Sequence, residues 1–207
     1  MTHGLSSRQA AKRAQIAKAA RKLFLAQGYA ATSMDAVTAE AGVSKQTLYN
    51  YFPTKIDLLT EVLGDSLDRI DSQQSGQPRI ETVDDLRRVL LQFASGFTRA
   101  VLTPDTVALM RLILGEVSRI PELRRSFRVA FPGRLMDAST ELVRVAAAKG
   151  LVSTASPEMS GRMFIGPLMT FIALDGFLNV TDEITPPTDA DLEFIVDAFL
   201  ATMQVPR

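Results

Sequence analysis

The side chains best suited to chemistry in this chain stand in one short run, residues 45–51, which reads KQTLYNY. The amides of Gln46 and Asn50 can each form two hydrogen bonds with adenine N6 and N7, and the ammonium of Lys45 can reach guanine or a phosphate. Tyrosine and threonine hydroxyls commonly bond phosphate oxygens, and the run also holds Thr47, Tyr49 and Tyr51. This composition predicts a helix face that fits the major groove of DNA.

Two short helices joined by a tight turn are expected to position that run. Apolar residues four apart mark the inward face of each helix; they are Val37 and Ala41 in the first, and Leu48 and Phe52 in the second. Gly42 lets the chain turn with a positive φ. Ser44 can cap the second helix, and Thr32 or Ser33 can cap the first. A solvated helix end would explain the polar face alone, but the caps, the turn and the inward pairs together favour a helix-turn-helix.

An ordered pattern runs through residues 16–63; it comprises Leu23, Phe24, Gly28, Tyr29, Thr32, Ala41–Lys45, Thr47–Tyr49, Phe52, Lys55, Leu58 and Leu59. In this pattern the segment resembles the DNA-binding domain of the tetracycline-repressor (TetR) family of transcriptional regulators. The resemblance implies a three-helix head that binds double-stranded DNA. Two departures lie on the groove side: Gln46 where the family usually has glycine, and Asn50–Tyr51 where it usually has an aromatic–histidine pair. Both leave the fold intact and change the expected operator sequence.

The residues expected to touch DNA all come from this head and its junction with the next helix. They are Thr32, Ser33, Ser44, Lys45, Gln46, Thr47, Tyr49, Asn50, Tyr51 and Lys55. Lys55 lies in the first turn of a fourth helix, just after Pro53, where its ammonium and the local backbone N–H groups can share a phosphate. That helix, expected over residues 55–72, joins the head to the rest of the chain.

Charge is unevenly distributed along the chain although its sum is zero. Residues 1–55 hold eight basic and two acidic side chains, a net charge of +6, and the remaining residues carry a net charge of −6. With this distribution, electrostatic attraction favours an approach to DNA in which residues 1–55 face the phosphates. Arg8, Lys12 and Arg13 are equally consistent with solvated side chains and with contacts to phosphate or to the minor groove.

Composition and motifs exclude most enzyme chemistry. Cysteine is absent, so the chain can have no disulfide, thiolate metal site or thiol nucleophile. The only histidine is His3, and no glycine-rich phosphate loop or HExxH motif is present. We therefore expect no catalytic residue, metal or cofactor. No secretory leader is recognisable, and the longest apolar stretch, 163–180, is interrupted by glycine, proline and aspartate, so we expect a cytoplasmic protein without membrane contact.

Beyond residue 55 the apolar spacing is helical, with no sustained period-two alternation. The expected helices cover roughly 83–101, 104–119, 121–149 with an interruption at Pro132, 157–178 with a kink at Pro167, and 188–204, with a polar loop at 73–78. Together with a first helix over 7–27, this predicts an all-α protein of about nine helices. Residues 1–54 are expected to form the helix-turn-helix domain, and residues 55–207 a larger ligand-binding and dimerisation domain.

Three segments of the larger domain are similar to the C-terminal regions of AefR-like members of the family: residues 110–127, AAAKGLV at 146–152 and SPEMSGRMF at 156–164. This likeness implies an effector-binding and dimerising domain. Methionine and aromatic side chains suit an apolar ligand; the candidate lining is Phe93, Phe97, Met110, Arg111, Leu114, Phe127, Phe131, Met136, Phe164 and Met169. Ordinary core packing is the alternative for each apolar member of this set.

Residues 165–178 are apolar on more than one side of a single helix. Such a helix must be covered on both faces, either by the chain's own core or by a second subunit. In the second case the expected interface comprises Phe171, Ile172, Asp175, Leu178, Phe199 and Met203. Two recognition helices about 34–36 Å apart would then read a palindrome.

The patterns together indicate a homodimeric, ligand-responsive transcriptional repressor that binds a DNA operator and is released by a small, largely apolar effector. The rival hypothesis is a helical adaptor that binds only proteins. The net charge of +6 on residues 1–55 and the groove-type face of residues 45–51 oppose that rival.

Overall fold

The computed structural model describes residues 7–71, 79–179, 181 and 183–203, and this part of the chain is helical with no β-strand. The α-helices are α1 (Ser7–Ala31), α2 (Met34–Ala41), α3 (Lys45–Tyr51), α4 (Lys55–Asp71), α5 (Val83–Val101), α6 (Pro104–Val117), α7 (Pro121–Arg128), α8 (Arg134–Ala148), α9 (Pro157–Phe171) and α10 (Asp189–Ala201). Two π-helical segments, η1 (Val129–Gly133) and η2 (Ile172–Phe177), follow α7 and α9. The prediction of an all-α protein is confirmed, and the loop expected at 73–78 lies outside the described residues.

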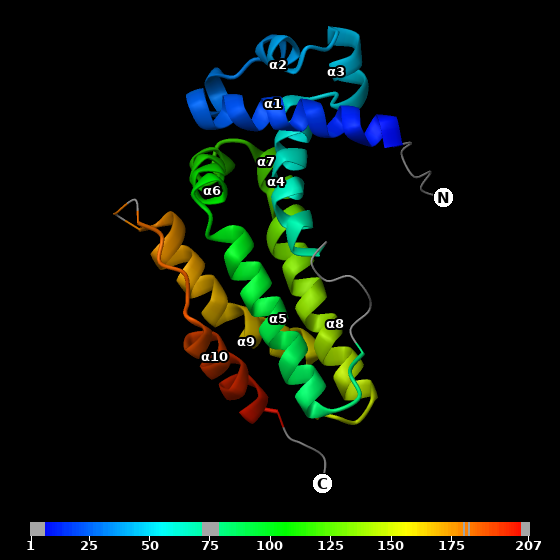
Figure 1. The fold of residues 1–207 in the computed structure, drawn as a ribbon, viewed down its shortest axis with the longest axis vertical. Coiled ribbons are helices and arrows are strands. Elements are labelled where there is room, and N and C mark those ends of the chain that lie inside the picture. The colour runs from blue at the N-terminus through cyan, green and yellow to red at the C-terminus, as the bar shows by residue number, and fades with distance from the viewer. Residues whose placement is uncertain (1–6, 72–78, 180, 182, 204–207) are drawn as a thin grey trace. The chain divides into compact units, whose positions relative to one another are not determined.

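The chain forms two compact units (Figure 1). The first contains the described residues up to Asp65 together with Ala108–Ala130, and the second contains the described residues of 66–107 and 131–207. Helices α4 and α6 therefore each contribute residues to both units. A functional boundary at residue 54 remains a prediction.

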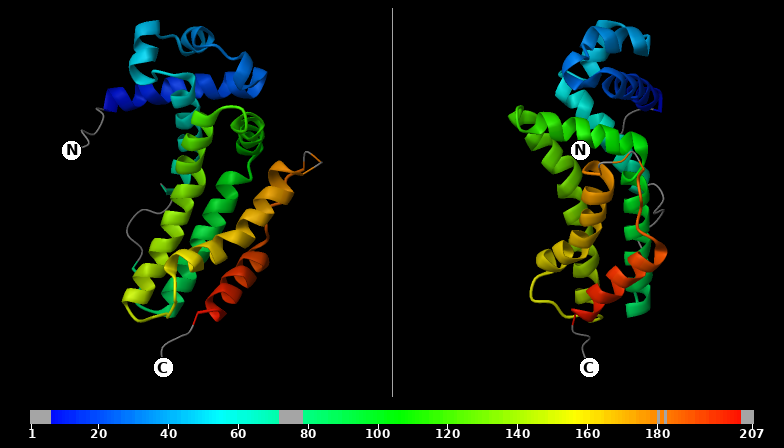
Figure 2. Two further views of the ribbon diagram at one scale, coloured as in Figure 1. Left: turned by 180° about the vertical axis from the view of Figure 1, so that it is seen from behind. Right: turned by 90° about the vertical axis from the view of Figure 1, so that its left-hand side faces the viewer.

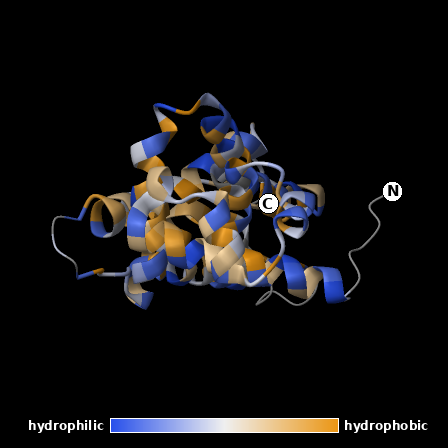
Figure 3. Cartoon of the chain, turned by 90° about the horizontal axis from the view of Figure 1, so that it is seen from above, coloured by the Kyte–Doolittle hydropathy of each residue, from blue (hydrophilic) through white to orange (hydrophobic). Residues whose placement is uncertain are grey.

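The first unit is built on α1, with α2 and α3 together on one side of it (Figure 1). Its buried apolar side chains include Ile16, Ala20, Phe24, Val37, Leu48, Phe52, Leu58 and Leu59. Helix α1 is interrupted at Gly28, whose φ of 83° lies in the region that glycine tolerates best. The first turns of α1 are mostly hydrophilic (Figure 3).

Arg13 ties α1 to α4 in this unit. Its guanidinium binds both carboxylate oxygens of Glu61 and lies 4.9 Å from the centre of the Phe52 ring. A bidentate arginine–carboxylate pair fixes both distance and orientation. Arg13 is therefore occupied within the protein, whereas Arg8 is exposed and Lys12 donates to the side chain of Gln15 at 2.9 Å.

The second unit has an aromatic core formed by α5, α9 and α10. Ring centroids are 6.3 Å apart for Phe93–Phe97, 5.8 Å for Phe93–Phe164 and 5.3 Å for Phe164–Phe199. These distances lie in the range where aromatic pairs attract one another. Helices α9 and α10 lie side by side in both views of Figure 2, so the core is closed by the C-terminal helix.

Two local contacts fix the packing of this unit. A Cβ atom placed on Gly161 would stand 2.9 Å from the hydroxyl oxygens of Ser139 and Thr140, so glycine permits the close approach of α9 to α8. The guanidinium of Arg87 on α5 donates to both carboxylate oxygens of Asp197 on α10, at 2.6 and 2.9 Å. The ion pair between Arg87 and Asp197 holds α10 against α5.

The two predicted proline sites differ, since Pro132 lies in a helix interruption and Pro167 lies inside a continuous α-helix. Pro132 lies within η1, between α7 and α8, where an interruption is expected. Pro167 lies inside α9, which changes to the π-helical segment η2 at Ile172 instead of continuing as an α-helix to residue 178. No helix in the described part of the chain is long and apolar enough to cross a membrane.

Candidate nucleic-acid interface

Helix α3 presents one polar face to solvent and one apolar face to the protein. Leu48 is fully buried and Phe52, just after the helix, is 1% exposed. Lys45, Gln46 and Asn50 are exposed, as is Tyr49 with 46% of its surface accessible. Thr47 and Tyr51 are half-buried at the edges of this face. The outward set is rich in amide and hydroxyl groups, which can pair with base edges and phosphates.

The turn between α2 and α3 sets the direction of that face. The hydroxyl of Ser33 accepts a hydrogen bond of 3.0 Å from the backbone N–H of Ala36 and so caps α2. Gly42 adopts φ 60°, the left-handed conformation that ends α2. The hydroxyl of Ser44 accepts from the backbone N–H of Thr47 at 3.1 Å and caps α3. These are the signals of a helix-turn-helix, and each stands where the sequence predicts it.

Lys45 is held by an acidic partner that the sequence analysis does not single out. Its Nζ donates to Oδ2 of Asp35 on α2 at 2.8 Å, and both side chains are exposed. The hydrogen bond and charge of Asp35 raise the pKa of Lys45. An exposed pair of this kind is weak in water, so the ammonium can exchange the carboxylate for a phosphate. The signal that could have found Asp35 is its acidic side chain in the first turn of α2, ten residues before Lys45.

Thr32 does not belong to the exposed face. It is 1% exposed; its hydroxyl donates to the Gly28 carbonyl at 2.7 Å and accepts from the Gln27 side chain at 3.2 Å. The capping role that Thr32 or Ser33 could have filled belongs to Ser33. The Thr32 side chain is used inside the protein in this structure, and its contact with DNA remains a prediction.

Lys55 is also directed into the protein. Its Nζ donates to the carbonyl oxygens of Tyr29 at 2.7 Å, Thr32 at 2.9 Å and Ala30 at 3.3 Å. A lysine ammonium has three hydrogens, so this arrangement occupies all of its donors. Burial lowers the pKa of Lys55. In this structure Lys55 joins the end of α1 to the start of α4, and its contact with a phosphate remains a prediction.

The fold and the exposed face of α3 agree with comparisons to known sequences. Residues 16–62 match the family described as bacterial regulatory proteins, tetR family, and residues 88–204 match the C-terminal domain of AefR-like transcriptional repressors. The second match alone spans more than half of the chain. The protein belongs to the TetR family.

Several characterised proteins are similar to this TetR-family chain. The transcriptional repressor KstR of Rhodococcus jostii (strain RHA1) is 32% identical over 102 residues, 49% of this chain and 48% of KstR. The transcriptional activator FasR of Mycolicibacterium smegmatis is 39% identical over 61 residues, 30% of this chain and 28% of FasR. The chain thus spans about half, or less, of the length of these relatives. The solved structure of the flavonoid-responsive regulator FrrA has 27% identity and a TM-score of 0.70, covering 96% of this chain and 99% of FrrA.

The effector residues expected in the AefR-like domain are divided between the two units. Phe93, Phe97 and Phe164 are buried in the aromatic core of the second unit, and Met110 is buried in the first. Met136, Met169 and Phe127 are half-buried, whereas Arg111 and Leu114 are exposed. The side chain of Phe131 lies outside the described residues. The effector role of the set remains a prediction.

The residues expected at the dimer interface include both buried and exposed side chains. Ile172 is fully buried, Phe199 is 5% exposed and Met203 is 6% exposed, all within the single chain. These three side chains pack in the core of the single chain, and their place in an interface remains a prediction. Phe171 and Asp175 are half-buried, and only Leu178 of the six is exposed.

Proposed function

We propose that this TetR-family protein is a ligand-responsive transcriptional repressor that binds a palindromic operator as a dimer and is released by a small, largely apolar effector. The observation that carries the proposal is the face of α3, where Lys45, Gln46 and Asn50 are exposed while Leu48 is fully buried. A buried apolar anchor holds the helix, and the exposed amides are of the kind that reads adenine in the major groove.

The residues proposed to contact DNA lie on α3 and at the caps of α2 and α3. They are Ser33, Ser44, Lys45, Gln46, Thr47, Tyr49, Asn50 and Tyr51. Helix α3 has only seven residues, a footprint too small for operator specificity. Two copies placed about 34–36 Å apart would read half-sites on successive turns of one duplex, which is the reason for proposing a dimer.

The surface proposed for the second copy lies on α9, η2 and α10. The exposed apolar residues there are Met159 and Met163 on α9, Leu174 in η2, Leu178 just after it, and Phe194 on α10. Ala190, Phe194, Ala198 and Ala201 on the outside of α10 are exposed and uncharged, and Asp197 beside them is paired with Arg87. A surface helix normally carries polar residues on its outer face, so this face favours burial against another subunit.

Regulation is proposed to be a change in the separation of the two α3 helices. An effector that binds better to the state unable to span successive half-sites shifts the population away from DNA. The similarity to FrrA, a flavonoid-responsive regulator, and to KstR, a transcriptional repressor, supports this proposal. We place the protein in the cytoplasm, with residues 1–54 binding DNA and residues 55–207 binding effector and partner.

The proposal is tested by selecting bound fragments from a pool of random duplexes. A dimeric regulator should enrich an inverted repeat whose half-site centres are about 10 base pairs, or a multiple of that, apart. The rival adaptor, which binds only proteins, should enrich no sequence and should leave a DNA-cellulose column at low salt. Failure to enrich any sequence, or elution from the DNA-cellulose column at low salt, would contradict the proposed function.

A further inference from the structure

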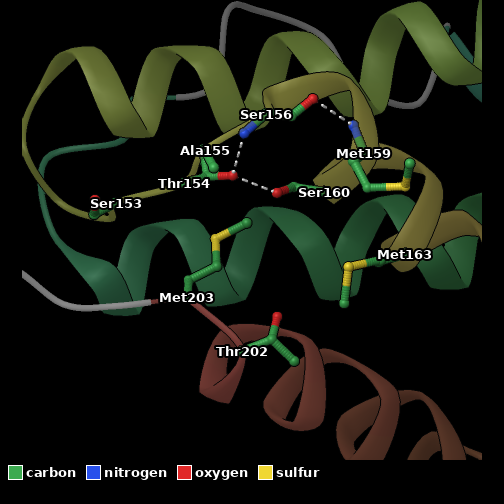
Figure 4. Close-up of a pocket in the computed structure, with 9 residues that line it drawn as sticks. All are labelled: Ser153, Thr154, Ala155, Ser156, Met159, Ser160, Met163, Thr202 and Met203. Carbon is green, nitrogen blue, oxygen red and sulfur yellow. Dashed lines mark hydrogen bonds between the residues drawn. The ribbon is translucent and has the colours of Figure 1, made fainter.

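Polar side chains on the surface of this chain bond to one another at two sites that differ in charge. In the cleft at the start of α9, the hydroxyls of Thr154 and Ser160 lie 2.7 Å apart, and the Thr154 hydroxyl accepts from the backbone N–H of Ser156 at 3.2 Å (Figure 4). These bonds join neutral groups within six residues of one another, so they shape the turn before α9. The pair of Lys45 and Asp35, by contrast, joins two full charges on different helices of the proposed DNA-binding surface.

The helix-turn-helix itself carries little positive charge. Residues 32–54 contain only three charged side chains, Asp35, Glu40 and Lys45, with a net charge of −1. The positive charge of the head comes mainly from six basic residues between positions 8 and 22, all on α1. Lys45 is the one basic side chain in the sequence of α2 and α3. Any charge attraction between these two helices and the phosphates of DNA therefore depends on Lys45.

Asp35 gives the ammonium of Lys45 the kind of partner that DNA would offer. The Nζ of Lys45 donates to Oδ2 of Asp35 at 2.8 Å, and the two side chains are 66% and 63% exposed. A phosphate oxygen would accept the same charge-assisted hydrogen bond. A contact between Lys45 and a phosphate therefore exchanges one ion pair for another and leaves the carboxylate of Asp35 unpaired beside the duplex. The net gain from such an exchange is small.

We propose that Asp35 takes the place of a DNA phosphate for Lys45 and thereby cancels most of the sequence-independent attraction of α3. Affinity at this helix is then left to the groups that pair with base edges, the amides of Gln46 and Asn50. Asp35 is a positioning residue, because it acts through Lys45. The inference rests on the proposed binding of DNA by α3. It gives Asp35, which is not among the proposed DNA contacts, the role of limiting affinity for DNA of any sequence.

The variant Asp35→Asn tests this role, because it keeps the shape of the side chain and removes its charge. Affinity is measured for the selected operator and for a random duplex of the same length, at several salt concentrations. The control Glu40→Gln makes the same change of charge on the same helix, but Glu40 pairs with Lys22 of α1, at 2.7 Å. Both variants are also made in chains that carry Lys45→Met, and thermal unfolding of every chain is measured in parallel.

Asp35→Asn should raise the affinity for both duplexes by about two- to fivefold per subunit. The slope of log affinity against log salt concentration should steepen by about 0.9 per subunit, since Lys45 then neutralises a phosphate. In chains with Lys45→Met the gain from Asp35→Asn should disappear, whereas any gain from Glu40→Gln should persist. The midpoint of thermal unfolding should fall by about 2 °C or less, because an exposed ion pair adds little to stability.

The role of Asp35 is overturned by any of three results. A gain from Asp35→Asn that persists with Lys45→Met would show a general effect of charge. Weaker binding of Asp35→Asn to the operator alone would show that Asp35 directs Lys45 to a base. Unchanged affinity and salt slope would show that the pair does not compete with DNA, and the proposed function stands in that case if the wild-type chain binds its operator. A wild-type chain that binds no duplex contradicts the proposed function itself.

Discussion

The ammonium of Lys55 lies 4.3 Å from the centre of the Tyr29 ring and donates a hydrogen bond of 2.7 Å to the carbonyl oxygen of the same residue. The face of the Tyr29 ring and its carbonyl oxygen both present partial negative charge to the ammonium of Lys55. Burial raises the pKa of Tyr29, and the carboxylate of Glu116 contributes to the same shift. This pair joins the end of α1 to the start of α4, next to the helix-turn-helix.

Lys55→Met should lower the stability of the head. The substitution keeps the aliphatic stem and deletes donors to three carbonyl groups, for which we expect a loss of about 1–2 kcal/mol. Thermal unfolding measures the loss, and Lys18→Met, at an exposed position on α1, is the matched control. Operator affinity at several salt concentrations decides the role of Lys55: a slope shallower by about 0.9 per subunit would identify it as a phosphate contact.

Gln46→Ala and Asn50→Ala should each change base preference at particular operator positions. We expect a loss of about 1–3 kcal/mol when the amide is bonded to a base edge. Competition binding against operators with single base-pair substitutions measures the change. Gln92→Ala, an exposed glutamine on α5, should leave all of these affinities unaltered. If Gln46→Ala and Asn50→Ala weaken binding equally on every duplex, the two side chains contact the DNA backbone instead.

Phe194→Asp and Phe199→Asp should have different effects although both lie on α10. Phe194 is 75% exposed and Phe199 is 5% exposed. A charge at Phe194 should therefore give a folded monomer with weak operator binding, whereas a charge at Phe199 should unfold the chain because it buries an unpaired carboxylate. Sedimentation and circular dichroism separate these outcomes. A folded dimer from Phe194→Asp would show that this face of α10 is not an interface.

Asp191 should stabilise α10 at neutral pH and lose this effect in acid. Its carboxylate accepts from the hydroxyl and the backbone N–H of Thr188, at 2.6 and 2.8 Å, and these bonds lower the pKa of Asp191 below its usual 3.8. The stabilisation is complete above pH 3.8 and is lost as the pH falls through the lowered pKa. Asp191→Asn should therefore be less stable than wild type at pH 7. In urea unfolding the difference should shrink below pH 3.8, and a difference that is the same at every pH would argue against the capping role.

Much of the head could be predicted from sequence because its signals are local. Ser44 and Gly42 act on backbone groups within a few residues, and Leu48 and Phe52 alternate with polar neighbours in a helical period that fits only one orientation. The structure confirms this helix-turn-helix. The interruption at Pro132 is local in the same sense, since proline acts on its own turn.

Sequence-based prediction is hardest where a side chain is used by a distant segment. Lys55 reads as an exposed cation after a proline, but its three carbonyl partners lie 23 to 26 residues earlier in the chain. Phe194 and Phe199 are both apolar residues of one helix, and only the packing of α10 on α5 and α9 shows that the second is core. Sequence periodicity alone does not distinguish a face covered by the same chain from one covered by a partner.

The central claim, that paired α3 helices read DNA on one face of the duplex, is tested most directly by operator spacing. Affinity is measured for the selected operator and for the same operator with five base pairs, about half a helical turn, inserted between its half-sites. The insertion should abolish specific binding, because one of the two helices then faces the wrong side of the duplex. Equal affinity for both duplexes would contradict this claim.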